Sequence, residues 1–380
     1  MKVFIIAGEP SGDKLGGAVM SGLRSLVPDL TFDGIGGVEM SAEGLTSRFP
    51  MDELSVMGLA EVLPRMPHLL RRIRETAKAV IAAQPGLLLT IDSPDFCLRV
   101  AKRVRARSAI RTVHCVAPTV WAWRPGRAAK MAPHIDHVLA LFPFEPPYME
   151  AAGMACDFVG HPVVAERQAT EAEAQAFRRD HGIGAGPMIL ALPGSRRGEV
   201  SRLAGRFGQA LAQVATAHPG TRVVLPAAAP VLTLVREVTA GWPVSPLILD
   251  PAAEDGGRRK RAAFRAADVA LAASGTVSLE LAAADTPMII AYDMAWLSRQ
   301  IISRMVRVDS ACLVNLVAET REIPEFIGAR CRADLIAPAL LALLDDPAAQ
   351  HDAMARTMRA LGAGGEAPGL RAARAVLRVL

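Results

Sequence analysis

The chain has 380 residues, of which 51% are hydrophobic and 21% charged, a composition typical of a globular protein large enough for two domains. Its net charge of +5 suits anionic substrates or a membrane surface and is too small to indicate a nucleic-acid-binding protein. The five cysteines are scattered without a C-x-x-C pair, so we expect reduced thiols in the cytoplasm, without a disulfide framework or a zinc site. Strand-like residues begin at Val3, and no uncharged run reaches the roughly 18 residues of a spanning helix, so we expect no signal peptide and no transmembrane segment.

Apolar, strand-like runs alternate with helical segments along most of the chain. These runs are 3–7, 30–34, 87–91, 111–116, 137–141, 157–159, 188–192, 222–225, 247–249, 269–272 and 288–291. Alternation of this kind predicts parallel sheets with helices on both faces. The expected fold class is therefore α/β, with two Rossmann-like, doubly wound domains.

A break in this pattern near residues 160–170 predicts the domain boundary, because a polar helical stretch replaces the alternation there. We expect a first domain over residues 1–165, a second over 166–345 and a helical tail over 346–380. The Gly-rich segment 362–369 interrupts the helices of that tail. Open parallel sheets bind ligands at the carboxyl ends of their strands, so two such domains predict a cleft between those ends.

The first strand runs into the sequence AGEPSGD, residues 7–13, ahead of a helix expected from residue 14 to 26. Gly8 and Gly12 let the backbone turn sharply, and Ser11 or Asp13 is expected to cap the helix. The spacing matches neither the hydrolase elbow, nor the dinucleotide fingerprint, nor the P-loop. From this segment alone, a tight capped turn and a ligand-binding loop both stay open.

A second acidic turn, DSPDF, follows the strand at 87–91. Asp92 ends a buried strand, where a carboxylate is costly unless it is hydrogen-bonded or used, and this makes Asp92 a candidate general base. Pro94 stops the strand, and Asp95 is expected to cap the next helix. Glu9 ends the first strand in a similar way. The spacing of Asp92 and Asp95 lacks the D-x-D pattern of a metal-bound nucleotide, so we expect no metal and no cofactor.

A candidate phosphate loop follows the strand at 188–192. It contains Gly194, Ser195 and Arg196 immediately before a helix. Backbone N–H groups, a hydroxyl and a guanidinium at a helix start are the donors that phosphate needs. A solvated basic turn is the alternative, and the buried strand before the loop disfavours it.

A second small-residue loop follows the strand at 269–272. Ser274, Gly275 and Thr276 precede a helix whose first turn carries Glu280. A diphosphate at this helix start gains from the helix dipole, and Glu280 is placed to reach ribose hydroxyls. An ordinary helix cap is the alternative for this loop.

Histidines and tryptophans give weaker signals. His161 ends a strand near the predicted boundary, and a hinge and a substrate contact both stay open for it. His134 and His137 are spaced like metal ligands, but no third ligand is evident and a solvated pair is favoured. Trp121 and Trp123 form either a packed corner or a contact for an amphiphile.

Residues 56–75 combine apolar and basic side chains at helical spacing. The apolar stripe is Val62, Met66, Leu69, Leu70 and Ile73, and the flanking cations are Arg65, Arg71, Arg72 and Arg74. A helix lying in a membrane interface and an amphipathic helix facing the core both explain this pattern. Pro64 and Pro67 are expected to prevent a regular helix before residue 67, which favours the membrane interpretation.

Taken in order, these motifs resemble one family, the lipid-A-disaccharide synthases, which are nucleotide-sugar glycosyltransferases of bacterial outer-membrane lipid biosynthesis. The matching segments are AGEPSGD, MGLAEVLPR, IDSPDF, APTVWAWR, FPFE, FVGHP, LPGSR and ASGTVSLE. The resemblance implies a GT-B fold, with the acceptor mainly in the first domain and uridine diphosphate (UDP) in the second. It also implies transfer of 2,3-diacylglucosamine from its UDP carrier to 2,3-diacylglucosamine 1-phosphate (lipid X), which releases UDP.

The resemblance also assigns roles to individual residues. Glu9 and Ser11 face the acceptor, and Asp92 is the base that takes the proton from the attacking 6-hydroxyl in an inverting transfer. Arg196 and Glu280 match the family's nucleotide-side residues, and Asn315 matches a family asparagine. The further candidates for binding the substrate or UDP are Gly194, Ser195, Ser274, Gly275, Thr276 and His161.

The implied partners are UDP-diacylglucosamine, lipid X and, peripherally, the inner membrane of a Gram-negative bacterium, with no nucleic acid. A monomer and a homodimer both stay open. Other GT-B proteins, such as a UDP-sugar epimerase or a muropeptide glycosyltransferase, share the ASGT-type loop but lack AGEPSGD together with IDSPDF. A nucleotide-sugar-binding protein without catalysis is the remaining class, and Asp92 with Glu9 argues against it.

Overall fold

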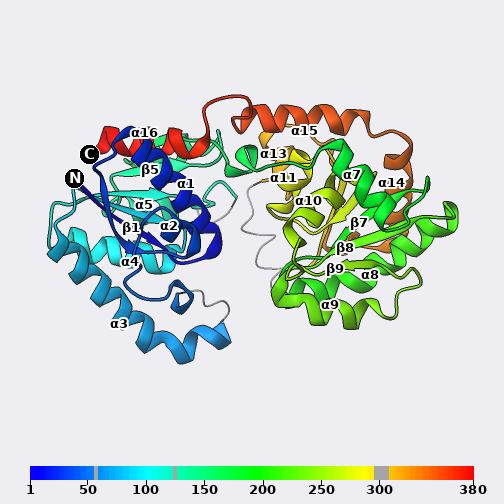
Figure 1. Cartoon of the computed structure of the whole chain (residues 1–380), viewed down its shortest axis with the longest axis horizontal. Helices are drawn as coiled ribbons and strands as arrows, with labels where there is room; N and C mark the ends of the chain where they lie inside the picture. The colour runs from blue at the N-terminus through cyan, green and yellow to red at the C-terminus, as the bar shows by residue number, and fades with distance from the viewer. Residues whose placement is uncertain (55–58, 123–125, 295–307) are drawn as a thin grey trace. The chain divides into compact units, whose positions relative to one another are not determined.

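The computed structural model describes residues 1–54, 59–122, 126–294 and 308–380, with the side chains of 59–64 left aside. The chain divides into two compact units, Met1–Ala165 with Leu361–Leu380, and Glu166–Ala360 (Figure 1). Each unit contains a six-stranded, parallel sheet with helices between the strands. This architecture confirms the predicted fold class of two doubly wound α/β domains.

The first sheet has the strand order β2-β1-β3-β4-β5-β6. Its strands are β1 (Lys2–Ala7), β2 (Thr31–Ile35), β3 (Leu87–Ile91), β4 (Arg111–Cys115), β5 (His137–Ala140) and β6 (Ala155–Phe158). Every residue of β3 is buried, as expected for a central parallel strand covered on both faces. In the register of the sheet Ala7 pairs with Ile91, so the turns after β1 and β3 leave the same edge side by side.

The helices of the first unit cover both faces of this sheet. They are α1 (Pro10–Leu26), α2 (Val38–Ala42), α3 (Leu59–Ala83), α4 (Pro94–Arg105), α5 (Gly126–Met131), α6 (Pro146–Glu150) and α16 (Pro368–Val379). α1 begins at Pro10, earlier than the residue 14 predicted, because a proline is well suited to the first helical turn.

The predicted side-chain caps of α1 do not form. No side chain caps its first turn, so the expectation for Ser11 and Asp13 is wrong. The buried Asp13 carboxylate instead accepts hydrogen bonds from the backbone N–H groups at the start of α2, at 2.7 Å from Gly37, 2.9 Å from Glu39 and 3.1 Å from Met40. Asp13 therefore caps a different helix, where its charge also meets the positive end of the dipole.

α3 runs through both prolines, so the expectation that Pro64 and Pro67 prevent a regular helix there is wrong. The hydrogen bonds that these prolines remove lie in the first turns of a long helix. Farther along α3, Ile73, Ala77 and Val80 are buried in the core of the first unit. This packing stabilises the helix despite the prolines.

The second sheet has the strand order β12-β11-β10-β7-β8-β9. Its strands are β7 (Met188–Leu192), β8 (Arg222–Pro226), β9 (Leu247–Leu249), β10 (Val269–Ala272), β11 (Met288–Tyr292) and β12 (Glu325–Ile327). The edge strand β12 was not predicted, because three residues between a proline and a glycine are too few to show a pattern.

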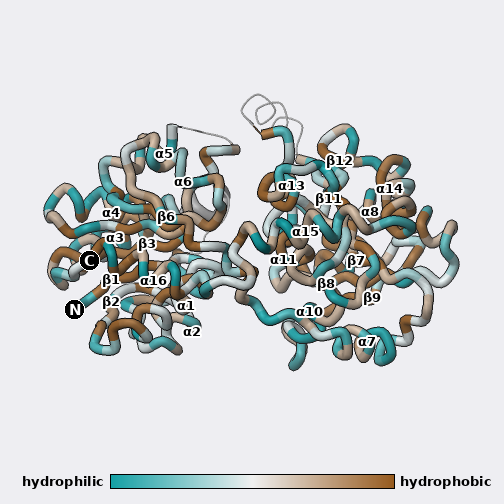
Figure 2. Tube along the Cα trace, turned by 90° about the horizontal axis from the view of Figure 1, so that it is seen from above, coloured by the Kyte–Doolittle hydropathy of each residue, from teal (hydrophilic) through white to brown (hydrophobic). Residues whose placement is uncertain are grey.

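The second unit surrounds this sheet with a further set of helices. They are α7 (Glu171–Asp180), α8 (Arg197–Ala217), α9 (Leu232–Thr239), α10 (Gly256–Ala266), α11 (Val277–Ala283), α13 (Leu313–Val317), α14 (Ala333–Asp345) and α15 (Ala348–Ala360). The hydrophobic core lies between the sheet and α8 with α14, whereas α10 is largely hydrophilic (Figure 2). Across the described ranges, no helix combines the length and the hydrophobicity needed to cross a bilayer.

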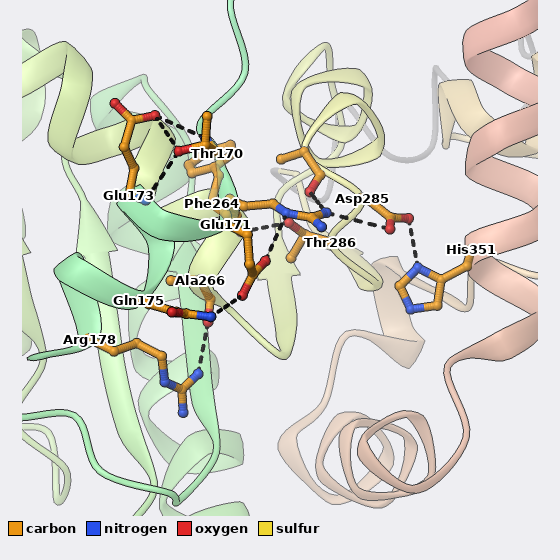
Figure 3. Close-up of polar contacts among 12 residues, drawn as sticks. Thr170, Glu171, Glu173, Gln175, Arg178, Phe264, Ala266, Asp285, Thr286 and His351 are labelled. Atoms are coloured by element: carbon orange, nitrogen blue, oxygen red, sulfur yellow. Dashed lines mark hydrogen bonds and ion pairs between the residues drawn. The ribbon is translucent and has the colours of Figure 1, made fainter.

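Polar contacts anchor the first helix of the second unit (Figure 3). Thr170 and Glu173 form a reciprocal capping box at the start of α7. Toward its other end, the Arg178 guanidinium donates a 2.8 Å hydrogen bond to the carbonyl of Ala266, the last residue of α10. The start of this unit is thus fixed by capping and by helix-to-helix contacts.

The predicted tail, residues 346–380, is not a separate part, because the two units share it. α15 belongs to the second unit, whereas α16 lies beside α1 in the first unit (Figure 1). A Cβ on Gly22 would lie 2.8 Å from the Gly369 carbonyl oxygen, so the two helices approach closely at glycine positions. The small buried face of α16, with Ala372, Ala373 and Val376, accounts for this packing.

Candidate functional site

Three of the predicted residues meet at the carboxyl edge of the first sheet. The Ser11 hydroxyl at the start of α1 lies 3.5 Å from a carboxylate oxygen of Asp92, the residue after β3. Glu9 immediately precedes α1 on the same edge. The register of β1 and β3 thus brings Ser11 and Asp92 together, with Glu9 on the same edge, and their roles stay a prediction.

The turn after β3 is strained. Asp92 and Ser93 both have left-handed backbone conformations, with φ of 50° and 41°. Such residues cost of the order of 1–3 kcal/mol each and persist where the surroundings hold them. The Asp92 N–H donates a 2.8 Å hydrogen bond to the Cys115 carbonyl, and a Cβ on Gly8 would lie 2.6 Å from the Ser93 hydroxyl. Gly8 is thus required for a close approach between the two turns.

The expected cap of α4 by Asp95 does not form. The N-cap residue is Ser93, without a side-chain capping bond, and Asp95 lies exposed in the first turn. The acidic turn therefore offers one half-buried carboxylate, Asp92, and one exposed carboxylate, Asp95.

Buried thiols and an imidazole behind this edge are held neutral. Burial, with the negative charge of Asp92 as a smaller cause, raises the pKa of Cys97 and raises that of Cys115 to about 12. Burial lowers the pKa of His114 to about 4, and its Nδ1 lies 2.8 Å from the Thr90 hydroxyl. Carboxylates, and not thiolates or an imidazole, are therefore the basic groups available at this edge.

An apolar cavity of about 260 Å³ adjoins Glu9 in the first unit. Its walls combine apolar side chains from α3 and its surroundings with the carboxylates of Glu9 and Asp95 and the guanidinium of Arg99. The apolar lining residues are Leu54, Met66, Leu69, Ile73 and Phe96. The cavity can accept an aliphatic chain next to a polar head group.

The amphipathic pattern of residues 56–75 is explained in large part by the core. Ile73 is buried, and Leu69 and Leu70 pack against the same core cluster. Arg72 is bound to Glu53 through two 2.8 Å hydrogen bonds and lies 4.4 Å from the ring centre of Phe49. The arginines at 65, 71 and 74 are exposed, and Val62 lies among the side chains that are not described.

Sequence analysis did not single out Glu145, the acidic residue of the FPFE segment. Its side chain is buried, accepts hydrogen bonds from the N–H groups of Leu141 and Phe142 at 3.0 Å each, and lies 3.3 Å from Trp121 Nε1. Burial raises the pKa of Glu145 to about 7. A single acidic residue at the end of the apolar stretch that follows β5 is the signal that could have identified it. Trp123 lies outside the described residues.

His161 is buried within the first unit, with its ring centre 5.4 Å from that of Phe142. Its Nδ1 accepts a 3.2 Å hydrogen bond from the Val163 N–H. His137 pairs with Asp157, 3.0 Å from Nε2 to a carboxylate oxygen. Within the described part of the chain, no three His, Cys, Asp or Glu side chains are grouped in a way that could hold a metal ion.

The loop before α8 differs from the predicted phosphate site. The Glu199 carboxylate accepts the backbone N–H groups of Ser195 at 3.2 Å and of Arg196 at 3.3 Å, so these donors are already used. Gly194 has a φ of 114°, and a Cβ there would lie 2.5 Å from a Glu199 oxygen. The Arg196 side chain pairs with Glu199 at 3.0 Å and stays 66% exposed, so the guanidinium is the anion-binding group left at this loop.

The loop before α11 is organised around Ser274. Its hydroxyl donates a 2.7 Å hydrogen bond to the Ala311 carbonyl, and no side chain caps the helix at Thr276. Gly275 has a φ of 149°, which favours glycine. Glu280 forms an ion pair with Lys260 of α10, and both side chains are partly exposed beside a cavity of about 130 Å³. The ordinary cap interpretation therefore does not account for Glu280.

The Asn315 side chain is held by hydrogen bonds within its own unit. It is fully buried, and its amide donates 2.8 Å hydrogen bonds to the Ile323 carbonyl and the Glu325 carboxylate while its oxygen accepts the Ile323 N–H at 3.1 Å. Asn315 also contributes to the lining of a surface pocket beside Leu316 and Glu319, and its contact with the substrate stays a prediction. A neighbouring acidic residue, Glu325, was missed because its partners lie 10 to 15 residues away.

The chain resembles known proteins along its whole length. A family model described as lipid-A-disaccharide synthetase matches residues 3–374. The lipid-A-disaccharide synthase of Ruegeria pomeroyi is 62% identical over 380 residues, which cover 99% of this chain and 95% of the relative. The protein of the same name from Rhodospirillum centenum is 46% identical, over 100% of this chain and 94% of the relative.

Solved structures resemble the fold at low sequence identity. UDP-GlcNAc 2-epimerase from Neisseria meningitidis, described as bound to UDP-GlcNAc, matches with a TM-score of 0.65 and 11% identity, over 100% of this chain and 99% of that one. A UDP co-structure of S. aureus MnaA matches with a TM-score of 0.64 and 12% identity, over 100% and 97% of the two chains. At such identities the likeness supports the fold alone, and that fold is the predicted GT-B class.

Proposed function

This chain belongs to the lipid-A-disaccharide synthase family, a family of glycosyltransferases, and we propose a specific reaction and base for it. The donor is UDP-2,3-diacylglucosamine and the acceptor is 2,3-diacylglucosamine 1-phosphate. The acceptor 6-hydroxyl attacks the anomeric carbon of the donor as its bond to the diphosphate breaks. The products are lipid A disaccharide 1-phosphate, with inverted configuration at the anomeric carbon, and UDP.

The carboxyl edge of the first sheet is the observation that carries this proposal. Asp92 takes the proton of the 6-hydroxyl as the new bond forms. The Ser11 hydroxyl, 3.5 Å from the Asp92 carboxylate, orients that carboxylate. Glu9 lies between this turn and the apolar cavity, which is suited to an acyl chain of the acceptor. Arg99 in the cavity wall provides a cation for the acceptor phosphate.

The second unit binds the nucleotide in this proposal. The exposed guanidinium of Arg196 neutralises diphosphate charge, and Glu280 accepts hydrogen bonds from the ribose hydroxyls. Ser274, Gly275 and Thr276 form the loop beside the diphosphate. The fold neighbours described with bound UDP-GlcNAc or UDP support a UDP-sugar as the donor class.

Incubation of the protein with UDP-2,3-diacylglucosamine and lipid X tests the reaction. We expect equal amounts of disaccharide and UDP, and neither product when one substrate is omitted. Release of UDP without disaccharide would indicate a hydrolase, and epimerised donor would indicate the epimerase alternative. Either result would contradict the proposal.

We also place the protein at the inner membrane of a Gram-negative bacterium, in peripheral contact. Arg65, Arg71 and Arg74 are exposed on α3, and each cation near an anionic surface adds about 1 kcal/mol of binding. Flotation with vesicles containing anionic lipid is expected to be salt-sensitive, and Arg71→Gln with Arg74→Gln is expected to reduce it. Exposed Arg107→Gln with Arg103→Gln on the C-terminal side of α4 serves as a control of equal charge. Equal flotation of both double variants would contradict membrane contact through α3.

A further inference from the structure

The loop at Ser274 is supported by a second segment, residues 310–312. The Ser274 hydroxyl donates its hydrogen bond to the carbonyl of Ala311, at 2.7 Å. Ala311 precedes α13, and its position therefore decides where the Ser274 side chain points. Ser310 steadies the same segment, because its hydroxyl accepts the Cys312 N–H at 3.1 Å.

The Glu325 carboxylate holds this segment from the other side. Glu325 is the first residue of β12, and one of its oxygens accepts the Ala311 N–H at 2.7 Å. The other oxygen accepts the Asn315 amide at 2.8 Å and the Ser310 hydroxyl. Across the described residues, these three donors are the hydrogen bonds of the carboxylate, and no ion pair involves it. Glu325 therefore accepts hydrogen bonds from three donors, two in the segment before α13 and one in α13 itself.

Asn315 fixes the other end of this arrangement. Its amide group bonds both the N–H and the carbonyl of Ile323, two residues before Glu325. Because Asn315 is fully buried, these bonds are shielded from water and strengthened by the low polarity around them. The loop and β12 are thus joined by a continuous set of hydrogen bonds from Ile323 to Ser274.

We propose that Glu325 is a positioning residue for the donor nucleotide, which acts by holding the Ala311 carbonyl against the Ser274 hydroxyl. The inference rests on the proposed function, because that function assigns UDP to the loop at 274–276. Glu325 does not touch the nucleotide in this scheme. Two of its three donors, Ser310 and Ala311, lie in the segment that supports Ser274, so the carboxylate orders that segment through hydrogen bonds.

The proposal makes a glutamine at 325 a poor substitute, although it has nearly the same shape. A carboxylate accepts all three donors, whereas a side-chain amide has one acceptor oxygen and directs its NH₂ group at one of the donors. A donor that loses its acceptor in a partly buried loop is costly. We expect Glu325→Gln to shift Ala311 and with it Ser274.

Gln350 provides the matched control, because it joins elements of the same unit at the opposite edge of the sheet. It is buried and bonds the N–H and carbonyl of Met288, at 2.8 and 3.0 Å, and the carbonyl of Glu322 at 3.2 Å. Met288 is the first residue of β11 and lies at the amino end of the strand. Gln350→Met removes three hydrogen bonds of its own and none of those that Glu325 or Ser274 makes.

The experiment measures UDP affinity by calorimetry, and the KM of donor and acceptor, in the full-length protein. Glu325→Gln is expected to weaken UDP binding about tenfold and to raise the donor KM by the same factor, with the acceptor KM unchanged. Gln350→Met is expected to lower the melting temperature without changing UDP affinity. Ser310→Ala, which removes one donor, is expected to act in the same direction as Glu325→Gln with a smaller factor, and it tests the proposal should Glu325→Gln fail to fold.

A double-mutant cycle separates positioning from general structural damage. If Glu325 acts through Ser274, then Ser274→Ala combined with Glu325→Gln weakens UDP binding no more than the larger single effect. Three outcomes would overturn the inference: the two substitutions multiply each other's effects, the acceptor KM rises equally, or Glu325→Gln keeps the parental UDP affinity. In each case disaccharide synthesis by the parent would leave the proposed function intact. Absence of UDP binding by the parent itself would instead overturn the proposed function, and this inference with it.

Discussion

Both sheets are parallel and six-stranded, but the carboxylates at their carboxyl edges are paired differently. In the first unit, Asp92 lies in a left-handed turn beside a hydroxyl, and no ion pair to it occurs among the described residues. In the second unit, Glu199 and Glu280 are each paired with a cation, Arg196 and Lys260. A carboxylate without a cation is suited to take a proton, whereas cations already held in place are suited to receive an anionic ligand.

In the proposed function, this difference gives one fold two chemical roles. Both edges are made of strand ends followed by turns and helix starts. The few side chains after each strand then decide whether the edge accepts a proton or an anion. The predictions below test this division, beginning with the largest expected effect.

Asp92→Asn is expected to reduce turnover by roughly 10²–10⁴, the usual contribution of a general base. Asparagine tolerates the left-handed backbone of this position, so the variant is expected to fold normally. Circular dichroism and initial-rate assays check both points. Asp29→Asn, at an exposed position ahead of β2, is the control and is expected to keep parental turnover. Parental turnover in Asp92→Asn would refute its role as the base.

Glu145 tests whether a carboxylate without a cation makes the free energy of unfolding of the chain depend on pH. Its pKa of about 7 lies above the ordinary value of 4.5, so the folded chain holds more protons than the unfolded chain between these values. The contribution of Glu145 to the free energy of unfolding is fully present below pH 4.5 and is lost as the pH rises toward 7. Above pH 7 it does not change further. The loss is of the order of 3 kcal/mol.

Urea unfolding at pH 4.5 and at pH 7.5 measures this dependence. Glu145→Gln is expected to lose less stability than the parent between the two pH values, because the variant has no carboxyl to ionise. Glu150→Gln, at an exposed position at the end of α6, is expected to keep the parental pH profile. Identical profiles for parent and Glu145→Gln would show that burial of Glu145 does not control its ionisation.

The strands could be predicted from the sequence because central parallel strands are continuous apolar runs. The strand at 87–91 was placed with the right ends, and its turn led directly to Asp92. The edge strand β12 was missed because its pairing with β11, and not a pattern of its own, makes it a strand.

The roles of several polar side chains could not be predicted, because their partners are distant in the sequence. Asp13 caps a helix 24 residues farther along the chain, and Asn315 is enclosed by a turn that includes Ile323. Sequence spacing identified Arg196 but gave no sign that Glu199 would occupy the backbone donors beside it. Local pattern locates a site, and tertiary contacts decide which of its groups stay available to a ligand.

Arg196→Ala is expected to weaken UDP binding about tenfold, because it removes an exposed guanidinium from the diphosphate. Calorimetry with UDP and with uridine separates the effects, since uridine lacks the diphosphate and is expected to bind the variant as it binds the parent. Arg197→Ala removes the same charge one residue away and serves as the control. Equal weakening by both variants would mean that the loop attracts UDP only through its general positive charge.

Glu280 and Lys260 give the smallest expected effect and separate the carboxylate from its ion pair. Both side chains are more than a third exposed, so solvent screens the pair and its contribution to stability is below about 1 kcal/mol. Lys260→Met is therefore expected to change UDP affinity less than about threefold. Glu280→Gln replaces the carboxylate that accepts hydrogen bonds from the ribose hydroxyls by a weaker acceptor. It is therefore expected to reduce the affinity for UDP and for uridine alike, whereas Arg196→Ala is expected to reduce only the affinity for UDP. A larger loss in Lys260→Met than in Glu280→Gln would mean that the ammonium group binds the nucleotide, and the assignment of the ribose to Glu280 would then be wrong.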